Sequence, residues 1–249
     1  GLGDVYKRQE LAHWNFDRVK EDAFAEWNRE LGKITVEGGS EEEKIKFYTD
    51  LWHSLLGRHT FSDFNGKYID NTGEEPVVRQ VPLDNGTPTR NTYNSDAFWG
   101  SEFNLNILWS IAYPKVMSEF VSTLVDYYTN GGMIARGPSG GNYTYVMVGD
   151  QATPLIAAAY NKGIRDFDIE SAYQGCLKNS EPGGIRDYVG YKTNPGNFMQ
   201  QYVDKGFVPE PTTKSPHAEG CAMTLYFAYE DWCLSLIHIS EPTRLRCIS

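Results

Sequence analysis

Apolar side chains recur at intervals of three and four residues along nearly the whole chain of 249 residues. This is the helical period, because residues at these intervals fall on one face of an α-helix. Runs that alternate apolar with polar residues, as a half-buried strand requires, are too short to build a sheet. The pattern therefore predicts an all-α fold, either a helical bundle or part of an α/α toroid.

Capping signals locate several of these helices. Ser40 is followed three residues later by Glu, which makes a capping box; Pro114 suits a first helical position, and Gly131-Gly132 would end that helix. Asp168 is a good N-cap for another. Asn65-Gly66 and Asn85-Gly86 are signals for turns that can close hairpins. Further helices are expected over residues 104–113, 154–161, 197–205 and 216–232.

Both ends of the chain are expected to be foreign to the natural protein. One choice of codons for residues 1–9 has a reverse complement that encodes Leu-Ser-Leu-Ile-His-Ile-Ser-Glu-Pro, which is residues 234–242 without a mismatch. The pair resembles a translated transposase-type sequencing adapter read in opposite orientations. We therefore predict that residues 1–9 and 234–249 derive from an adapter and that residues 10–233 are natural sequence.

Charge and composition exclude two classes of partner. The chain carries 23 basic and 33 acidic residues, and its Lys and Arg do not cluster, which disfavours a nucleic-acid partner. No run of about 18 apolar residues occurs, so no membrane-spanning segment is expected. Aromatic residues make up 14% of the chain, and many stand beside Asn, Asp and Gly. Such surroundings favour sugar binding, because ring faces pack on sugar C–H groups while polar side chains bind the hydroxyls.

Two candidate sugar-binding residues lie where a polar loop enters a helix. Trp99 can stack on a sugar ring, and Glu102 can accept hydrogen bonds from its hydroxyls. The alternative is structural: Trp99 then belongs to the core, and Glu102 interacts with the positive end of the helix dipole.

Three further candidates come from the next loops. Arg136 and Asn142 lie in a glycine-bearing loop whose backbone can approach a ligand closely, and the alternative is a loop made rigid for packing. Asp150 stands shortly before Pro154, where it is either a helix cap or a group that faces a site. No Cys or His pair has metal-ligand spacing, so we assign no metal ligand.

Five motifs follow one another along the chain, at residues 47–52 (FYTDLW), 61–68 (FSDFNGKY), 146–150 (VMVGD), 157–164 (AAAYNKGI) and 225–232 (LYFAYEDW). Together they resemble glycoside hydrolase family 92, whose members are mostly calcium-dependent exo-α-mannosidases that invert the anomeric centre. The resemblance covers nearly all of residues 10–233. It implies a glycan substrate and a secreted, periplasmic or cell-surface location.

The resemblance also implies a parent protein in which an N-terminal β-sandwich precedes an (α/α)6 toroid. Residues 10–233 would be the N-terminal part of that catalytic domain, a partial toroid incomplete at its C-terminal side. Family members carry the catalytic acid, the base and most calcium contacts in Glu-Gly-Asn-x-Trp-Gln-Tyr, Gly-Asn-Asp-Asp-x-Gly and Gly-Asn-Glu-Pro-Ser-His-His segments. None of these occurs here. We therefore assign no catalytic residue, and calcium is expected only in the parent.

One position departs from the family pattern. Many members have Trp-Asp-Thr, with the Asp contacting the terminal mannose, where this chain has Trp99-Gly100-Ser101. The expected function is a fragment of a mannosidase-like glycosidase, inactive alone, whose sugar-binding wall includes Trp99, Glu102, Arg136, Asn142 and Asp150. The alternatives are a noncatalytic glycan-binding or scaffold protein on the same helices and a toroid glycosidase for another α-linked sugar.

Overall fold

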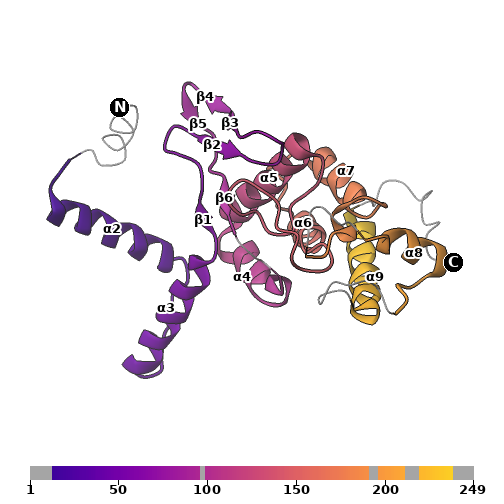
Figure 1. Cartoon of the computed structure of the whole chain (residues 1–249). Helices are drawn as coiled ribbons and strands as arrows, with labels where there is room; N and C mark the ends of the chain where they lie inside the picture. Colours follow the sequence, from indigo (N-terminus) through magenta and orange to yellow (C-terminus); the bar gives the residue numbers. More distant parts are fainter. Residues whose placement is uncertain (1–12, 96–98, 191–195, 211–218, 238–249) are drawn as a thin grey trace.

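A computed structural model describes residues 13–95, 99–190, 196–210 and 219–237. In these ranges the chain is mainly helical, which confirms the predicted fold class (Figure 1). None of the described helices is long and apolar enough to cross a membrane. The helices are α2 (Phe16–Leu31), α3 (Glu41–Leu56), η1 (Ser101–Phe103), α4 (Leu105–Ala112), α5 (Pro114–Gly131), α6 (Ala152–Asn161), α7 (Ile169–Asn179), η2 (Ile185–Asp187), α8 (Phe198–Lys205) and α9 (Gly220–Ile237).

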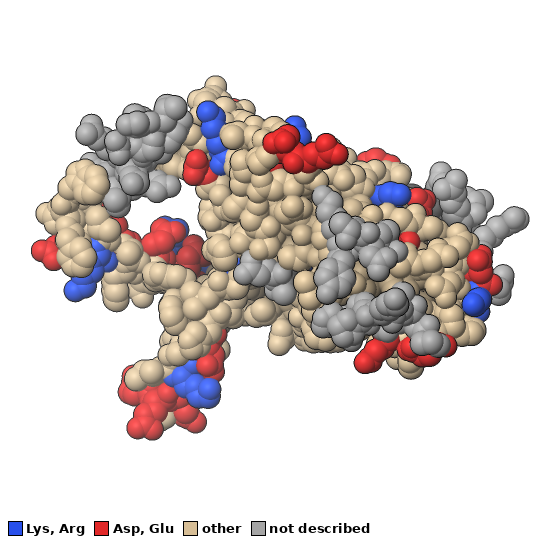
Figure 2. All heavy atoms as spheres, viewed as in Figure 1, with Lys and Arg blue, Asp and Glu red and all other residues tan. Residues whose placement is uncertain are grey.

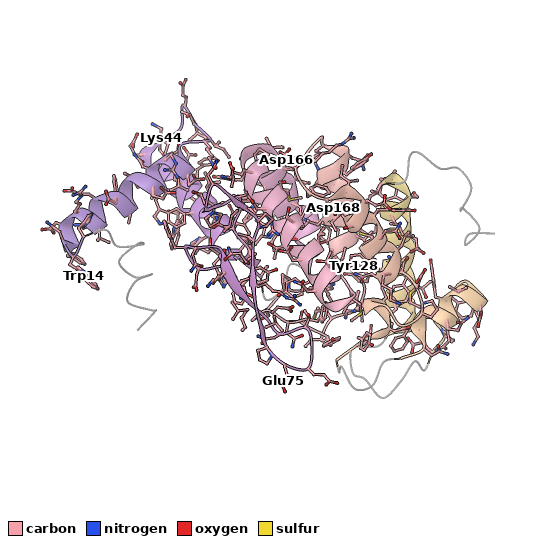
Figure 3. All side chains as sticks on the ribbon, turned by 90° about the horizontal axis from the view of Figure 1, so that it is seen from above. Trp14, Lys44, Glu75, Tyr128, Asp166 and Asp168 are labelled. Carbon is pink, nitrogen blue, oxygen red and sulfur yellow. The ribbon has the colours of Figure 1, made fainter. Side chains whose placement is uncertain are left out.

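Helices α2 and α3 form an arm that projects from the body, with Trp14 near its outer end (Figures 1 and 3). The predicted capping box starts α3: Ser40 Oγ accepts a hydrogen bond from the Glu43 N–H, and the Glu43 carboxylate accepts one from the Ser40 N–H. Helix α2, which the sequence analysis did not predict, buries none of its residues. The arm meets the body where the Tyr113 hydroxyl donates to the Glu30 carbonyl oxygen at 3.1 Å.

Six short strands pair in the segment after α3. The predicted turn at Asn85-Gly86 closes the β4 (Leu83–Asp84) and β5 (Thr87–Pro88) hairpin, and both residues have positive φ, as a two-residue type I′ turn requires. Asn65-Gly66 forms a turn ahead of β2 and does not close a hairpin. The other pairs join β2 (Lys67–Asp70) to β3 (Val77–Gln80) and β1 (His59–Thr60) to β6 (Tyr93–Asn94).

The main core surrounds α5 and α6. Helix α5 begins at Pro114 and ends at Gly131, and its C-cap Gly132 has a φ of 86°, the left-handed conformation that glycine adopts without strain. Its inner face includes Phe120 and Leu124, both fully buried. Helix α6 is short, yet seven of its ten residues are buried, because α4, α5, α7 and α9 all contact it. Side by side, these helices make the body of the molecule (Figure 3).

A smaller core joins α8 to α9. It contains Val148, Val189, Phe198, Met199, Val208, Met223 and Phe227. Helix α9 continues to Ile237, so its last turn includes residues 234–237. The predicted adapter boundaries stay predictions, and the expected start of this helix at residue 216 lies outside the described residues.

Several apolar side chains remain on the surface of the body. Ile111 on α4 is 73% exposed, and Leu225 and Trp232 on α9 are 68% and 56% exposed. Figure 2 shows that acidic side chains gather instead at the free end of α3, while much of the visible body carries no charge. Exposed apolar side chains also lie on the arm, where Phe24 on α2 is 72% and Ile45 on α3 is 66% exposed.

Replacing Leu124 by Ala is expected to lower the free energy of unfolding by about 2–5 kcal/mol, because it leaves a cavity in the main core. Ile111→Ala, on the exposed face of α4, should change it by less than about 0.5 kcal/mol. Urea unfolding followed by near-UV circular dichroism measures both. Equal losses would show that α5 is not the buried centre of the fold.

Candidate functional site

A pocket of about 200 Å³ opens where the end of α3 meets the loop before α4. This volume lies below the ~300–1,000 Å³ of pockets for drug-sized ligands, so it suits one small ring. Its described lining residues are Ser54, Gly57, Arg58, Ser95, Trp99, Gly100, Ser101, Asn104, Leu105 and Trp109. A separate space of about 10 Å³ between β2, β6 and α5 has room for a single water.

Arg58 gives the pocket its charge. The guanidinium carbon lies 4.4 Å from the ring centroid of Trp109 and 4.3 Å from that of Phe120, so the cation is held against two aromatic rings. Its Nη2 donates to Asn106 Oδ1 at 2.7 Å. Burial lowers the pKa of Arg58 to about 9, which still leaves it charged at neutral pH. Arg58 was not predicted from the sequence, because the two rings that hold it come from segments distant in the chain.

The loop before α4 forms the opposite wall. Trp99 is 44% exposed, which leaves much of its ring free to contact a ligand. Gly100 has a φ of 80°, and a Cβ there would meet only the Phe103 ring, at 4.0 Å. The Ser101 hydroxyl donates to Asn106 Oδ1 at 3.2 Å. Trp99 is therefore the predicted residue that the structure places directly in the pocket wall.

Glu102 follows this wall on η1 and is half-buried. Its Oε2 is buried and has no hydrogen-bond partner among the described residues. Burial raises the pKa of the Glu102 carboxyl, because loss of hydration disfavours the charged form. Glu102 is not among the described residues that line the pocket, so its predicted contact with a sugar stays a prediction.

Arg136 and Asp150 lie in the protein interior, away from the pocket. Arg136 is 2% exposed, and it donates from Nη1 to the Tyr188 carbonyl oxygen at 2.9 Å and from Nη2 to the Ile185 carbonyl oxygen. Asp150 is fully buried and accepts hydrogen bonds from the Ala152 N–H and the Thr153 hydroxyl at the start of α6. These contacts match the structural alternatives, and the sugar-binding roles remain predictions.

A buried ion network surrounds these two residues. Glu230 Oε1 on α9 accepts a hydrogen bond from the Asp150 N–H, and its Oε2 lies 3.1 Å from Arg186 Nε. Arg186 Nη1 also pairs with Asp231 Oδ1 at 2.6 Å. Burial raises the pKa of Glu230 to about 8, although Arg186 opposes this shift. The network joins the loop before α6, η2 and α9.

Asn142 supports its own loop. Its side-chain Oδ1 accepts a hydrogen bond from the Tyr143 N–H at 2.8 Å, and its backbone pairs with Ser139. It does not line the pocket, so its predicted contact with a sugar also remains untested.

The pocket offers groups for binding but none for acid–base chemistry among its described residues. Its lining includes two tryptophans, one arginine and several hydroxyl or amide side chains, but no Asp or Glu. The described residues also contain no group of three or more His, Cys, Asp or Glu that could hold a metal. Aromatic rings beside a few polar side chains suit a ligand that has both apolar and polar faces.

Comparison with known proteins identifies the family. The glycosyl hydrolase family 92 catalytic domain matches residues 5–239, and the chain therefore belongs to glycoside hydrolase family 92. An uncharacterized secreted glycosidase of Arthroderma benhamiae is 21% identical over 239 residues, which are 91% of this chain and 24% of that protein.

Solved structures agree on the fold. The family GH92 inverting mannosidase BT2199 of Bacteroides thetaiotaomicron matches with a TM-score of 0.77 and 24% identity, over 93% of this chain and 29% of its own. The family GH92 α-mannosidase BT3965 of the same bacterium matches with a TM-score of 0.73 and 22% identity, over 91% and 28%. The described helices are thus part of an α/α toroid, and the chain spans less than a third of these relatives.

The titration of Glu230 is expected to make the protein less stable as the pH rises from about 5 to about 8. The pKa of its carboxyl is about 8 when folded, against an ordinary value of 4.5, so in this interval mainly the unfolded state releases the proton. Glu230→Gln keeps an acceptor for the Asp150 N–H and removes the titration, so the decline should become shallower. Urea midpoints across this pH range measure it.

The control for this prediction is Glu42→Gln, which changes an exposed carboxyl in the first turn of α3. It should leave the pH dependence as it is in the unsubstituted protein. An unchanged decline in Glu230→Gln would show that the buried carboxyl does not titrate in this range.

Proposed function

We propose that this chain supplies part of the sugar-binding wall of a calcium-dependent, inverting α-mannosidase-like glycoside hydrolase. Family membership supports hydrolysis of a glycosidic bond, and two structural relatives are described as mannosidases. The observation that carries the proposal is the pocket at Trp99, where an exposed ring and a buried guanidinium face a space for one small ring. The aromatic face would pack on sugar C–H groups, and the polar side chains would orient the ring.

The bond-cleaving groups are proposed to lie in the rest of the parent protein. Inverting hydrolysis needs an acid and a base about 6.5–9.5 Å apart, with room for water between them. No such pair lines the pocket among the described residues. The described residues also contain no group of three or more His, Cys, Asp or Glu that could hold a metal ion. We therefore assign the chain a role in holding the sugar and derive no chemical step from its side chains.

We expect the chain alone to be inactive, because the bond-cleaving groups are proposed to lie in the rest of the parent protein. Its surface gives a second reason, because apolar side chains are exposed there. Ile111 on α4 and Leu225 and Trp232 on α9 leave large apolar side chains open to water. In the parent protein, further helices of the toroid would cover them.

The alternative is a noncatalytic glycan-binding protein, or a glycosidase for another α-linked sugar. Gly100 favours these alternatives, because it provides no carboxylate where many family members contact the terminal mannose with Asp. Because Gly100 lines the pocket, the loss of the family Asp at this position would change which sugar the pocket binds.

The full-length protein is expected to hydrolyse aryl α-mannosides, and a calcium chelator should reduce the rate, whereas residues 10–233 alone should give no hydrolysis. The rate of release of the aryl group is measured for the full-length protein, for the same protein with the chelator, and for residues 10–233 alone. Binding without hydrolysis by the full-length protein would favour the noncatalytic alternative. Hydrolysis by residues 10–233 alone would contradict the proposal that the chemistry lies elsewhere.

Trp99→Ala in the full-length protein should raise KM for an aryl α-mannoside about tenfold, equivalent to about 1.4 kcal/mol of lost stacking and contact area. Trp14→Ala removes an exposed tryptophan on the arm, far from the pocket, and should leave KM unchanged. Steady-state kinetics measures both. A KM unaffected by Trp99→Ala would remove this ring from the sugar-binding wall.

A further inference from the structure

We propose that Asn85, in the turn between β4 and β5, is a site of spontaneous deamidation, a modification that converts its side-chain amide to a carboxylate without an enzyme. Asparagine is a thermolabile residue, and a glycine after it leaves the next backbone nitrogen unhindered because glycine has no Cβ. The chain has three Asn-Gly pairs, at residues 65–66, 85–86 and 130–131, and their surroundings differ. The inference does not depend on the proposed function, since this turn does not line the pocket.

The modification proceeds through a cyclic succinimide. The Gly86 nitrogen forms a bond to Asn85 Cγ and gives up its proton, and Asn85 Nδ2 takes up a proton and leaves as ammonia. Water then opens the ring at the side-chain carbonyl, which gives aspartate, or at the main-chain carbonyl, which gives isoaspartate. The net change consumes water and releases ammonia, so it needs no oxidant and no other reactant.

The turn at Asn85 leaves the reacting groups accessible. Asn85, Gly86 and Thr87 are all exposed, and their hairpin lies at the outer edge of the molecule (Figure 1). A Cβ on Gly86 would meet no atom within 4 Å, so the space around its backbone is open. The Gly86 N–H makes no hydrogen bond among the described residues.

The hairpin also opens at a small cost in free energy. Its ladder contains only the pairs Leu83–Pro88 and Asp84–Thr87, and exposed segments with few contacts open locally most often. The Asn85 amide donates to the Asp84 carboxylate at 3.0 Å, but Asp84 is itself exposed. Local opening therefore lets the Gly86 nitrogen reach Asn85 Cγ while the rest of the fold stays intact.

The pair at residues 65–66 has the same sequence but is held by hydrogen bonds. The Gly66 N–H donates to the Asp63 carbonyl oxygen at 2.8 Å. The Asn65 Oδ1 accepts from the Lys67 N–H at 2.9 Å. Both the attacking nitrogen and the amide under attack are thus engaged, and Gly66 is buried.

The pair at residues 130–131 lies in the last turn of α5. There the Gly131 N–H belongs to the hydrogen-bond ladder of the helix. Asn130 Nδ2 donates to the Tyr68 hydroxyl at 3.3 Å, which holds the amide away from the backbone. Asn85 is therefore the Asn-Gly asparagine that the structure leaves open to reaction.

The two products have different effects on the hairpin. Aspartate tolerates the left-handed conformation that Asn85 adopts, with its φ of 49°, so this product keeps the turn. Isoaspartate carries the main chain through the former side chain, which a two-residue type I′ turn cannot accommodate. The pairing of β4 with β5 is lost in that fraction of the molecules.

The test incubates the full-length protein in mildly alkaline buffer and follows the three asparagines by peptide mapping with mass spectrometry. Asn85 should convert at least about tenfold faster than Asn65 and Asn130, because its segment opens more readily. In urea, where all three pairs are exposed, the three rates should converge. Equal rates in the folded protein, or no conversion of Asn85, would overturn the proposal.

Asn85→Gly gives an independent measure, because Gly-Gly also suits a type I′ turn and carries no amide. Ion-exchange chromatography should show that this variant accumulates acidic species more slowly than the unsubstituted protein. The matched control, Asn65→Gly, should accumulate them at the unsubstituted rate. If Asn85→Gly also accumulates them at the unsubstituted rate, Asn85 is not the site.

Discussion

The burial of α6 is the constraint on which the rest of the structure depends. This helix is short and rich in alanine, and its small side chains let α4, α5, α7 and α9 approach it closely. Asp150 and Thr153 fix its first turn. Glu230 then attaches α9 to the same turn through the Asp150 N–H. Because the network is buried and joins three segments, the position of α9 is set in the interior rather than at the surface.

The buried interior also positions the side chains near the pocket. Glu230 and Tyr226 are four residues apart on α9, so they lie on neighbouring turns of one helix. The turn that is held by the ion network therefore determines where Tyr226 meets Trp99. Arg58 fixes the other wall, since it packs between rings of α4 and α5. Arg136 and Asp150 do not line the pocket; their hydrogen bonds go to the η2 segment and to the start of α6.

Local sequence signals predicted the starts and ends of helices, because these depend on residues that are close together in the chain. The Ser40 capping box, the Gly132 end of α5 and the Asp168 N-cap are all present, because each is decided within one turn of helix. Helix α2 was not predicted, although Asn15 caps its start, and the structure buries none of its residues. The pocket was predicted only at Trp99. Arg58 lines the pocket because its guanidinium packs on the rings of Trp109 and Phe120, which lie far from it in the sequence, and local spacing cannot reveal such contacts.

A crystal structure of the full-length protein with an unhydrolysed α-linked mannobiose tests the central claim most directly. The account predicts that one sugar ring packs against Trp99 and that the acid and base facing the glycosidic oxygen come from outside residues 13–237. A carboxylate from the described residues within hydrogen-bond distance of that oxygen, or a sugar bound away from Trp99, would contradict it.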